Sequence, residues 1–335
     1  FSGVLILSKE GYEVPSDIWY RLSKMLEFIL YYTKPNGLAP IIGDQDDARL
    51  HPFSQESNLD HTNLLALGAV VFDRADFKIA ASKLPLEACM MLDIDSEIIF
   101  NNLQTKNGFL TSKAFPDAGF YIIRQGRDYM FINNSGKSKY AELGSGTHTH
   151  SDLLSFELFI DDKSFIVDPG TYVYSSSPEE RMLFRSTSMH NTIVIDGHNQ
   201  NTLDRNNLWD FKRDAIPKHL QWEDTEDRVI YVGEHNGYEK LSSPVIHCRR
   251  IEYFKHERKW VIEDSLSGSG VHYVELYLHF DIGIDIGYSD NLLSTQCDRG
   301  TNIDIHFRAE KGLHGTIKDG WVSKAYSSRE KAKVF

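Results

Sequence analysis

The sequence predicts an α+β protein of two domains, with helices in the first third of the chain and an antiparallel β-sandwich in the rest. Apolar residues recur at helical spacing up to about residue 110, and beyond it they alternate with polar residues in short segments. No helical pattern separates those segments, which favours antiparallel strands packed as two sheets. We therefore predict a helical domain over residues 1–110 and a β-sandwich domain over residues 111–335.

Three helices are expected in the first domain. Apolar residues follow helical spacing from Ile18 to Tyr32, with Asp17 as a candidate N-cap, and the residues 34–37 (Lys-Pro-Asn-Gly) end that helix. A second helix is expected to begin near Asp60, and a third near Pro85, a residue type that suits a first helical turn. Helix pairs joined by loops are typical of an (α/α) toroid or of a helical bundle.

Strands are expected throughout the second domain. The residues 125–128 (Gln-Gly-Arg-Asp) separate two apolar segments and predict a hairpin. The alternation from Leu154 to Ile160 predicts a half-buried strand with Glu157 on its solvated face. Further strands are expected at residues 191–195, 228–235, 246–254, 258–264 and 272–280.

Composition excludes several classes of protein. Among the 335 residues, 41% are hydrophobic and 25% are charged, as in ordinary folded domains. The net charge of −12 does not suit nucleic-acid binding, and an acidic polymer would have to be held by local Arg, Lys and His side chains. No apolar run reaches about 18 residues, so we expect no membrane insertion. Cys89, Cys248 and Cys297 are odd in number and far apart, which predicts neither a disulfide framework nor a cysteine metal motif.

The densest group of candidate functional residues surrounds two histidines. His148 and His150 are two positions apart, so an extended chain places both imidazoles on the same side. Asp168 ends an apolar run, where a carboxylate needs a partner, and His190 precedes the strand expected at residues 191–195. Strand ends can converge in an antiparallel sheet, and two imidazoles with one carboxylate suit Zn²⁺. Structural histidines held by hydrogen bonds are the alternative interpretation.

These motifs, in this order, resemble the heparinase II/III family of polysaccharide lyases. The resemblance is carried by His148-Thr149-His150 with residues 151–157, by residues 165–172 around Asp168-Pro169-Gly170, by residues 184–187, and by His190-Asn191-Thr192. It extends to residues 40–49, 235–238 and 248–251, and overall from about residue 10 to 325. It implies the end of an (α/α) toroid followed by an antiparallel β-sandwich, and cleavage of an acidic, uronate-containing polysaccharide by β-elimination. It also implies a periplasmic or secreted location.

The resemblance also implies roles for individual residues. His148 matches the catalytic histidine of the family's sandwich domain, and the zinc ligands match His150, Asp168 and His190. The family's catalytic Tyr and its toroid Asn or His would precede Phe1, so we expect this chain by itself to be inactive or nearly so.

Three residues are candidates for substrate binding. Arg185 could hold a substrate carboxylate or form a structural ion pair, and Arg49 could face the toroid cleft or stabilise its loop. Tyr238, like Tyr172 and Tyr174, could line a sugar groove or simply pack in a sheet.

Two other functions remain open from the sequence. A glycoside hydrolase on a similar frame needs two carboxylates across a groove, and Asp44, Asp46 and Asp47 could supply them. A non-catalytic carbohydrate-binding or exopolysaccharide-biosynthesis protein would bind a glycan without turnover.

Overall fold

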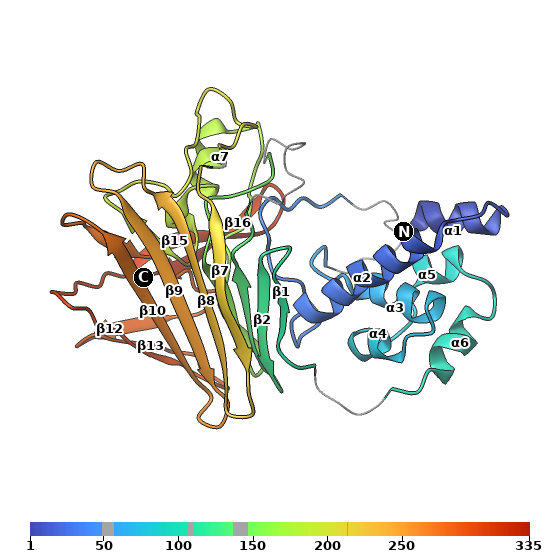
Figure 1. Ribbon diagram of the computed structural model, residues 1–335. Helices are drawn as coiled ribbons and strands as arrows, with labels where there is room; N and C mark the ends of the chain where they lie inside the picture. Colours follow the sequence, from blue (N-terminus) through green and yellow to red (C-terminus); the bar gives the residue numbers. More distant parts are fainter. Residues whose placement is uncertain (49–56, 106–109, 137–146, 213) are drawn as a thin grey trace. The chain divides into compact units, whose positions relative to one another are not determined.

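The computed structural model describes residues 1–48, 57–105, 110–136, 147–212 and 214–335, and the chain forms two compact units (Figure 1). The first unit comprises residues 1–40 and 47–110. The second comprises residues 41–46 and 111–335. The short segment 41–46 therefore belongs to the sheet-rich unit although it lies within the helical part of the sequence, a placement that the apolar pattern does not indicate.

The described part of the first unit is helical. Its helices are α1 (Ser2–Lys9), α2 (Ser16–Tyr32), α3 (Thr62–Val71), α4 (Ala75–Ala80), α5 (Leu86–Met91) and α6 (Ser96–Asn102). Leu26 and Leu30 of α2 pack against Leu65 of α3 and Phe77 of α4, since apolar residues three and four apart share one helix face. The helices expected from Ile18, from Asp60 and from Pro85 are confirmed as α2, α3 and α5. No helix among the described residues is both long and apolar enough to cross a membrane.

Two antiparallel sheets form the second unit's core. One has the strand order β1-β2-β3-β4-β5 and the other β10-β9-β8-β7. The strands of the first sheet are β1 (Lys113–Phe115), β2 (Phe120–Gln125), β3 (Asp128–Asn133), β4 (Ser155–Ile160) and β5 (Lys163–Ile166). Those of the second are β7 (Pro217–Asp224), β8 (Arg228–Tyr238), β9 (Val245–Phe254) and β10 (Lys259–Gly268).

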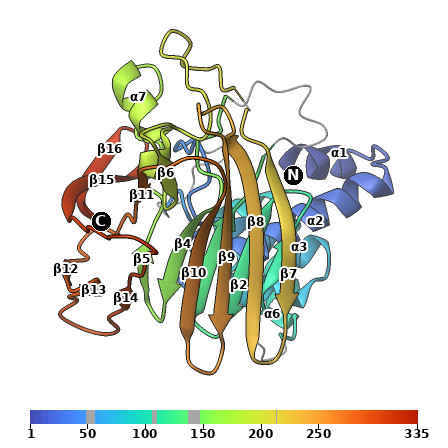
Figure 2. The same cartoon turned by 60° about the vertical axis from the view of Figure 1, so that its left-hand side comes forward.

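The two sheets pack face to face. Figure 2 shows β7–β10 in front of β2 and β4. Ile123 and Phe156 from one sheet share a buried cluster with Val229, Ile251 and Tyr253 from the other. This packing confirms the predicted antiparallel β-sandwich. The hairpin predicted at residues 125–128 is confirmed as the turn between β2 and β3.

Smaller elements complete the unit. Helix α7 (Pro178–Phe184) lies at one end of the sandwich in both views (Figures 1 and 2), and the 3₁₀ turn η2 (Thr187–Met189) follows it. The remaining strands are β6 (Ile193–Ile195), β11 (Val274–Leu276), β12 (Ile286–Ser289), β13 (Leu292–Thr295), β14 (Asp304–His306), β15 (Lys318–Ala325) and β16 (Ser328–Val334). Strand β6 follows His190 in the chain and pairs with β11.

The prediction of a half-buried strand with a solvated Glu157 is wrong. Every residue of β4 is buried, and Glu157 accepts a hydrogen bond from the backbone N–H of Ile41 at 2.7 Å. The reason lies in the topology, because β4 runs between β3 and β5 and the segment 41–46 approaches the side chain of Glu157.

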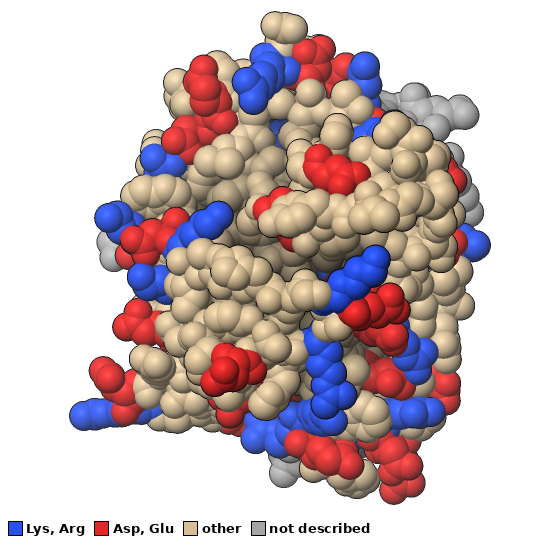
Figure 3. Space-filling view, turned by 90° about the vertical axis from the view of Figure 1, so that its left-hand side faces the viewer, with Lys and Arg blue, Asp and Glu red and all other residues tan. Residues whose placement is uncertain are grey.

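Charges are interleaved on the face of the molecule that Figure 3 shows. Lys and Arg side chains lie among Asp and Glu side chains there, and no extended patch of one sign is visible. An acidic polymer would therefore find no broad basic surface on that face, in keeping with the net charge of −12.

Candidate metal and catalytic centre

The three predicted metal ligands converge at one end of the sandwich. His150 precedes β4, Asp168 follows β5, and His190 precedes β6, and all three side chains are buried. The ligand atoms that they offer all lie within 4.8 Å of one another. Strands β4 and β5 are neighbours in the sheet, so the segments that enter the first and leave the second lie side by side.

Hydrogen bonds determine which ring nitrogens are left over. Nε2 of His150 lies 2.9 Å from Oδ1 of Asp44, and Nδ1 of His190 lies 2.7 Å from Oδ2 of Asp168. The other two ring nitrogens, Nδ1 of His150 and Nε2 of His190, are buried and have no hydrogen-bond partner. Each buried unpaired polar atom costs about 1–3 kcal/mol, and a bound ion would remove that cost.

The protonation of His150 also suits a ligand. Burial lowers the pKa of His150 to about 4, against the opposing effect of its hydrogen bond to Asp44. The ring is therefore neutral at neutral pH. Because Nε2 faces a carboxylate, it carries the proton, and Nδ1 presents a lone pair. Two imidazoles and a carboxylate form a donor set that fits Zn²⁺.

Asp44 is the centre of the surrounding hydrogen-bond network. Its side chain is buried, and Oδ2 lies 3.0 Å from Nδ1 of His148. The guanidinium of Arg181 binds both carboxylate oxygens as a fork, with 2.6 Å between Nη2 and Oδ2. Burial alone would raise the pKa of Asp44, but the hydrogen bonds from His150 and Arg181 outweigh it and hold that pKa below its ordinary range. The carboxylate is therefore ionised while it orients both histidines.

The segment 41–46 is held against the histidine loop by its backbone. The N–H of Asp44 donates to the carbonyl of His148 at 2.9 Å, and the N–H of Gln45 donates to Oγ1 of Thr171 at 2.7 Å. Gly43 has a φ of 55°, and a Cβ built on it would lie 2.4 Å from the carbonyl oxygen of His148. This position requires glycine both for its backbone conformation and for the close approach.

His148 is the exposed member of the group. Its side chain is 66% exposed, and its Nδ1 faces the carboxylate of Asp44. An imidazole that is oriented by an ionised carboxylate and open to solvent can accept or donate a proton. The arrangement thus separates one reachable histidine from a buried group of ligand type.

Two predicted substrate-binding residues, Arg185 and Tyr238, are not placed on an open surface. Arg185 is fully buried, with Nε bonded to the carbonyl of Thr149 at 3.0 Å and Nη1 to that of Leu208 at 2.7 Å. Burial lowers the pKa of Arg185 to about 10. The side chain thus braces the loop that carries His148 and His150, and a role as a substrate clamp is not supported in this conformation.

Tyr238 does not extend the site either. Tyr238 is buried, and its hydroxyl donates to the carbonyl of Ile193 at 2.7 Å, so it packs β8 against β6. A side chain without exposed surface cannot contact a sugar, and this contradicts the substrate-binding role for Tyr238. Arg49 lies outside the described residues.

The geometry does not favour a glycoside hydrolase. Asp44 is committed to Arg181 and to two histidines, whereas the acid of such an enzyme needs a raised pKa and access to the glycosidic oxygen. Asp46 accepts a hydrogen bond from the hydroxyl of Tyr174 at 3.3 Å.

Sequence reasoning missed Arg181 and the orienting role of Asp44. Arg181 and Arg185 are four residues apart, so both side chains leave α7 and its C-cap on one face, and this pairing was the available signal. Asp44 lies in the segment 40–49 that carries the resemblance, but its pairing with His148 spans 104 residues and is not visible in the sequence pattern.

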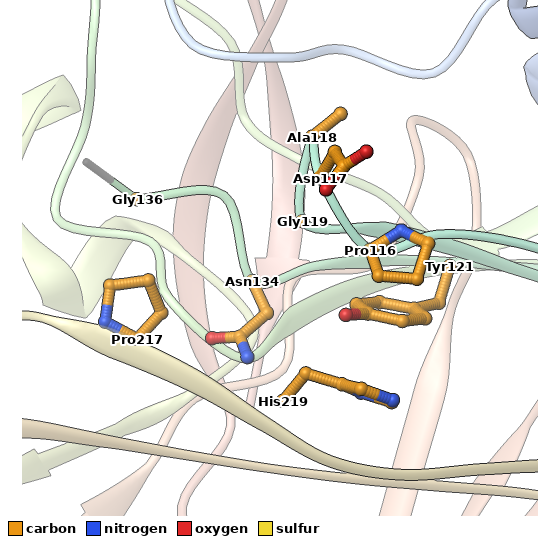
Figure 4. Close-up of a pocket in the computed structure, with 9 residues that line it drawn as sticks. All are labelled: Pro116, Asp117, Ala118, Gly119, Tyr121, Asn134, Gly136, Pro217 and His219. Carbon is orange, nitrogen blue, oxygen red and sulfur yellow. The ribbon is translucent and has the colours of Figure 1, made fainter. Parts of the chain in front are cut away.

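A separate small pocket lies near the turn between β1 and β2 (Figure 4). The ring of Tyr121 stacks on His219 at a centroid distance of 5.0 Å beside Asn134. The volume of this pocket, about 130 Å³, is below the roughly 300–1,000 Å³ of typical ligand pockets. It therefore does not hold a polysaccharide.

Fold and site together define a class: β-sandwich proteins in which a buried His/Asp/His group lies beside an exposed histidine. The family model "Heparinase II/III-like, C-terminal" matches residues 110–334. The chain therefore belongs to the heparinase II/III-like family.

Curated relatives and solved structures agree with this family. A heparin-sulfate lyase of Bacteroides stercoris is 27% identical over 228 residues, covering 66% of this chain and 31% of the relative. One of Bacteroides thetaiotaomicron is 23% identical over 345 residues, covering 95% and 43%. The crystal structure of a heparan sulfate lyase from Pedobacter heparinus matches with a TM-score of 0.72 at 19% identity, covering 96% of this chain and 44% of that one. The chain thus spans less than half of the length of these relatives.

Proposed function

We propose that the chain is part of a zinc-containing lyase that cleaves an acidic, uronate-containing polysaccharide by β-elimination. The observation that carries the proposal is the joint placement of exposed His148 and buried His150 on the two oxygens of Asp44. The names of the relatives, heparin-sulfate lyases, support the substrate class.

The zinc assignment rests on the chemistry of the donors. His150, Asp168 and His190 would hold the ion, and the unpartnered nitrogens of both histidines support this. Asp44 would orient the imidazole of His150, as carboxylates do for metal-bound histidines. Zinc would supply a fixed positive charge that ties the strand ends together, so its effect on the loop of His148 would be mainly structural.

β-Elimination requires proton transfer at the uronate. A base removes the proton at C5, the C4–O bond breaks, its electrons leave with the oxygen, and that oxygen is protonated. We infer that His148 takes part in this proton transfer, because its ring is exposed and Asp44 holds its Nδ1. The ionised carboxylate stabilises an imidazolium when His148 carries the additional proton.

Elemental analysis of the purified chain tests the metal site. We expect about one zinc per chain, and loss of that zinc in His150→Ala, because the variant removes one of three ligands. The exposed His256 provides the control, and His256→Ala should retain zinc. A folded wild-type chain that contains no metal, and that takes up none from added Zn²⁺, would contradict the assignment.

The reaction is tested by the ultraviolet absorbance of unsaturated uronates. The assay uses the protein as purified from its host. His148→Ala should lower the rate by about 10²–10⁴-fold while zinc is retained, as expected for loss of a group that transfers protons. The control His256→Ala should leave the rate unchanged. Binding of a uronate polymer without any unsaturated product would instead identify a carbohydrate-binding protein.

We further propose that the helical unit is part of an (α/α) toroid. Apolar side chains on several of its helices are exposed, as expected of helices that pack against further helices: Ile6, Leu7, Tyr20, Met25, Met90 and Ile98. A periplasmic or secreted location belongs to the same proposal, and fractionation of the host tests it.

A further inference from the structure

Two aromatic rings, those of Tyr174 and Trp209, adjoin the ring of the exposed His148. The ring centroids of His148 and Tyr174 are 6.3 Å apart, those of His148 and Trp209 are 6.3 Å apart, and those of Tyr174 and Trp209 are 5.4 Å apart. Interplanar angles between 61° and 70° place each ring edge-on to the next. Tyr174 and Trp209 come from loops on either side of α7, so the fold gathers them from separate segments.

One face of two of these rings is already occupied. The guanidinium of Arg181 lies 5.3 Å from the ring centroid of Tyr174 and 5.6 Å from that of Trp209. Arg181 is itself buried and bound to Asp44, so it fixes both rings from the inside. Trp209 nevertheless remains 39% exposed, and it stands beside a histidine that is 66% exposed. The structure thus holds a large aromatic surface open next to the candidate catalytic residue.

Polar and charged side chains adjoin the two rings. Tyr174 donates its hydroxyl to Asp46, and the guanidinium beneath the rings is neutralised by Asp44. A pyranose ring that presents its C–H face can stack on the indole, while its hydroxyl groups find an acceptor in Asp46.

We propose that Trp209 and Tyr174 form a sugar-stacking subsite, which takes the pyranose unit next to the one that His148 contacts. This subsite rests on the proposed function, since it assumes an acidic polysaccharide as the ligand. The pyranose ring stacks on the indole of Trp209. Tyr174, which contacts Arg181 and Asp46, fixes the orientation of the Trp209 ring.

A different explanation is that the rings only cover the buried ion pair of Asp44 and Arg181. The two explanations predict different results when the indole is removed. A cover protects the zinc site and the stability of the chain, whereas a platform contributes to the binding of sugar.

Calorimetric titration with tetrasaccharides of heparan sulfate, of chondroitin and of alginate distinguishes the sugar-binding explanation from the covering one. We expect Trp209→Ala to raise the Kd of the hexosamine-containing ligands by about tenfold or more and to keep its zinc, because stacking on an aromatic ring contributes substantially to affinity. Trp209→Phe, which keeps a smaller ring, should recover part of the affinity. The alginate tetrasaccharide, which contains only uronates, shows whether the subsite requires a hexosamine.

Trp260→Phe is the matched control for the loss of an indole. Trp260 lies on β10 opposite Tyr253, and the hydroxyl of Tyr253 bonds to Asp128 at the start of β3. The other end of β3 carries Asn133, which bonds to Asp152 near the candidate site. Trp260 is therefore remote from that site. This variant should bind as the wild type does.

Two results would overturn the subsite. In the first, Trp209→Ala binds as tightly as the wild type, whether or not it loses zinc, and the lyase proposal is unaffected. In the second, a zinc-loaded wild type binds none of the tetrasaccharides, and the absorbance assay then decides the lyase proposal separately.

Discussion

One carboxylate connects the parts of the site at the residue scale. Asp44 contacts exposed His148, buried His150 and buried Arg181, and its own backbone N–H is bound to the carbonyl of His148. Removing a partner would leave a buried charge uncompensated, which is strongly destabilising. The orientations of His148 and His150 therefore depend on the position of a single short segment.

Gly43→Ala tests that dependence. Gly43 and Gly126 have φ values of 55° and 57°, but a Cβ at Gly126 would meet nothing within 4 Å. Both substitutions should lower the free energy of unfolding by about 1–2 kcal/mol because of the left-handed backbone. At Gly43 the collision with His148 should also shift Asp44 and weaken zinc binding by about 10–100-fold. Chelator competition measures the zinc affinity, and equal affinities for the two variants would argue against the role of the segment.

At the scale of elements, β6 and β8 carry residues close to the site without exposing them. Tyr238 of β8 reaches the carbonyl of Ile193 in β6, three residues after His190. Asn191 donates from Nδ2 to the carbonyls of Phe156 and Val167 at 2.8 and 2.9 Å, which joins the chain at His190 to the first sheet. These bonds position the strand ends where the ligand group forms.

Tyr238→Phe distinguishes packing from substrate binding. The variant should lower the free energy of unfolding by about 1 kcal/mol, the usual contribution of one hydrogen bond, and leave tetrasaccharide binding unchanged. Tyr273, whose side chain is exposed, is the control, and Tyr273→Phe should change neither quantity. Weaker sugar binding by Tyr238→Phe at unchanged stability would restore its predicted role.

Periodicity predicted the elements that bury an apolar face. Helix α2 and strands β8 and β9 were predicted in this way, because apolar residues repeat about every 3.6 residues in the helix and every second residue in the strands. Strand β7 was missed because it is an edge strand, paired only with β8, and it exposes most of its residues. The proximity of His150, Asp168 and His190 was predictable since each adjoins a recognisable strand. Asp44 and Arg181 were not, because their placement depends on long-range packing.

At the scale of the whole molecule, a buried polar network spans the second sheet and reaches the site. Nε2 of His235 lies 3.1 Å from Nδ1 of His247, and Nε2 of His247 lies 2.7 Å from Oδ1 of Asp264. Arg249 bonds to Asp264 through Nε and Nη2, and its Nη1 donates to the carbonyls of Leu154 and Asn191. The network thus connects β8, β9 and β10 to the chain beside the candidate ligands.

This network predicts that acid destabilises the protein. Burial lowers the pKa of His247, and burial together with the neighbouring His247 and Arg249 lowers the pKa of His235 further. Both rings are neutral in the folded state, whereas in the unfolded chain a histidine takes up a proton below about pH 6.5. The unfolded state then binds more protons, so the free energy of unfolding falls as pH decreases. Each ring contributes about 1.4 kcal/mol per pH unit between its two pKa values.

Urea unfolding between pH 7 and pH 5, with chelator present so that metal release does not contribute, measures this slope. His235→Asn keeps a polar atom near the N–H of Gly237, which bonds to Nδ1 of His235, but it removes one proton-binding group from the unfolded state. Its slope should be smaller than that of the wild type by about 1.4 kcal/mol per pH unit, while exposed His256→Asn should match the wild type. Equal slopes for His235→Asn and the wild type would mean that His235 is protonated in the folded protein. The hydrogen bond from the N–H of Gly237 to Nδ1 of His235 would then have to be absent.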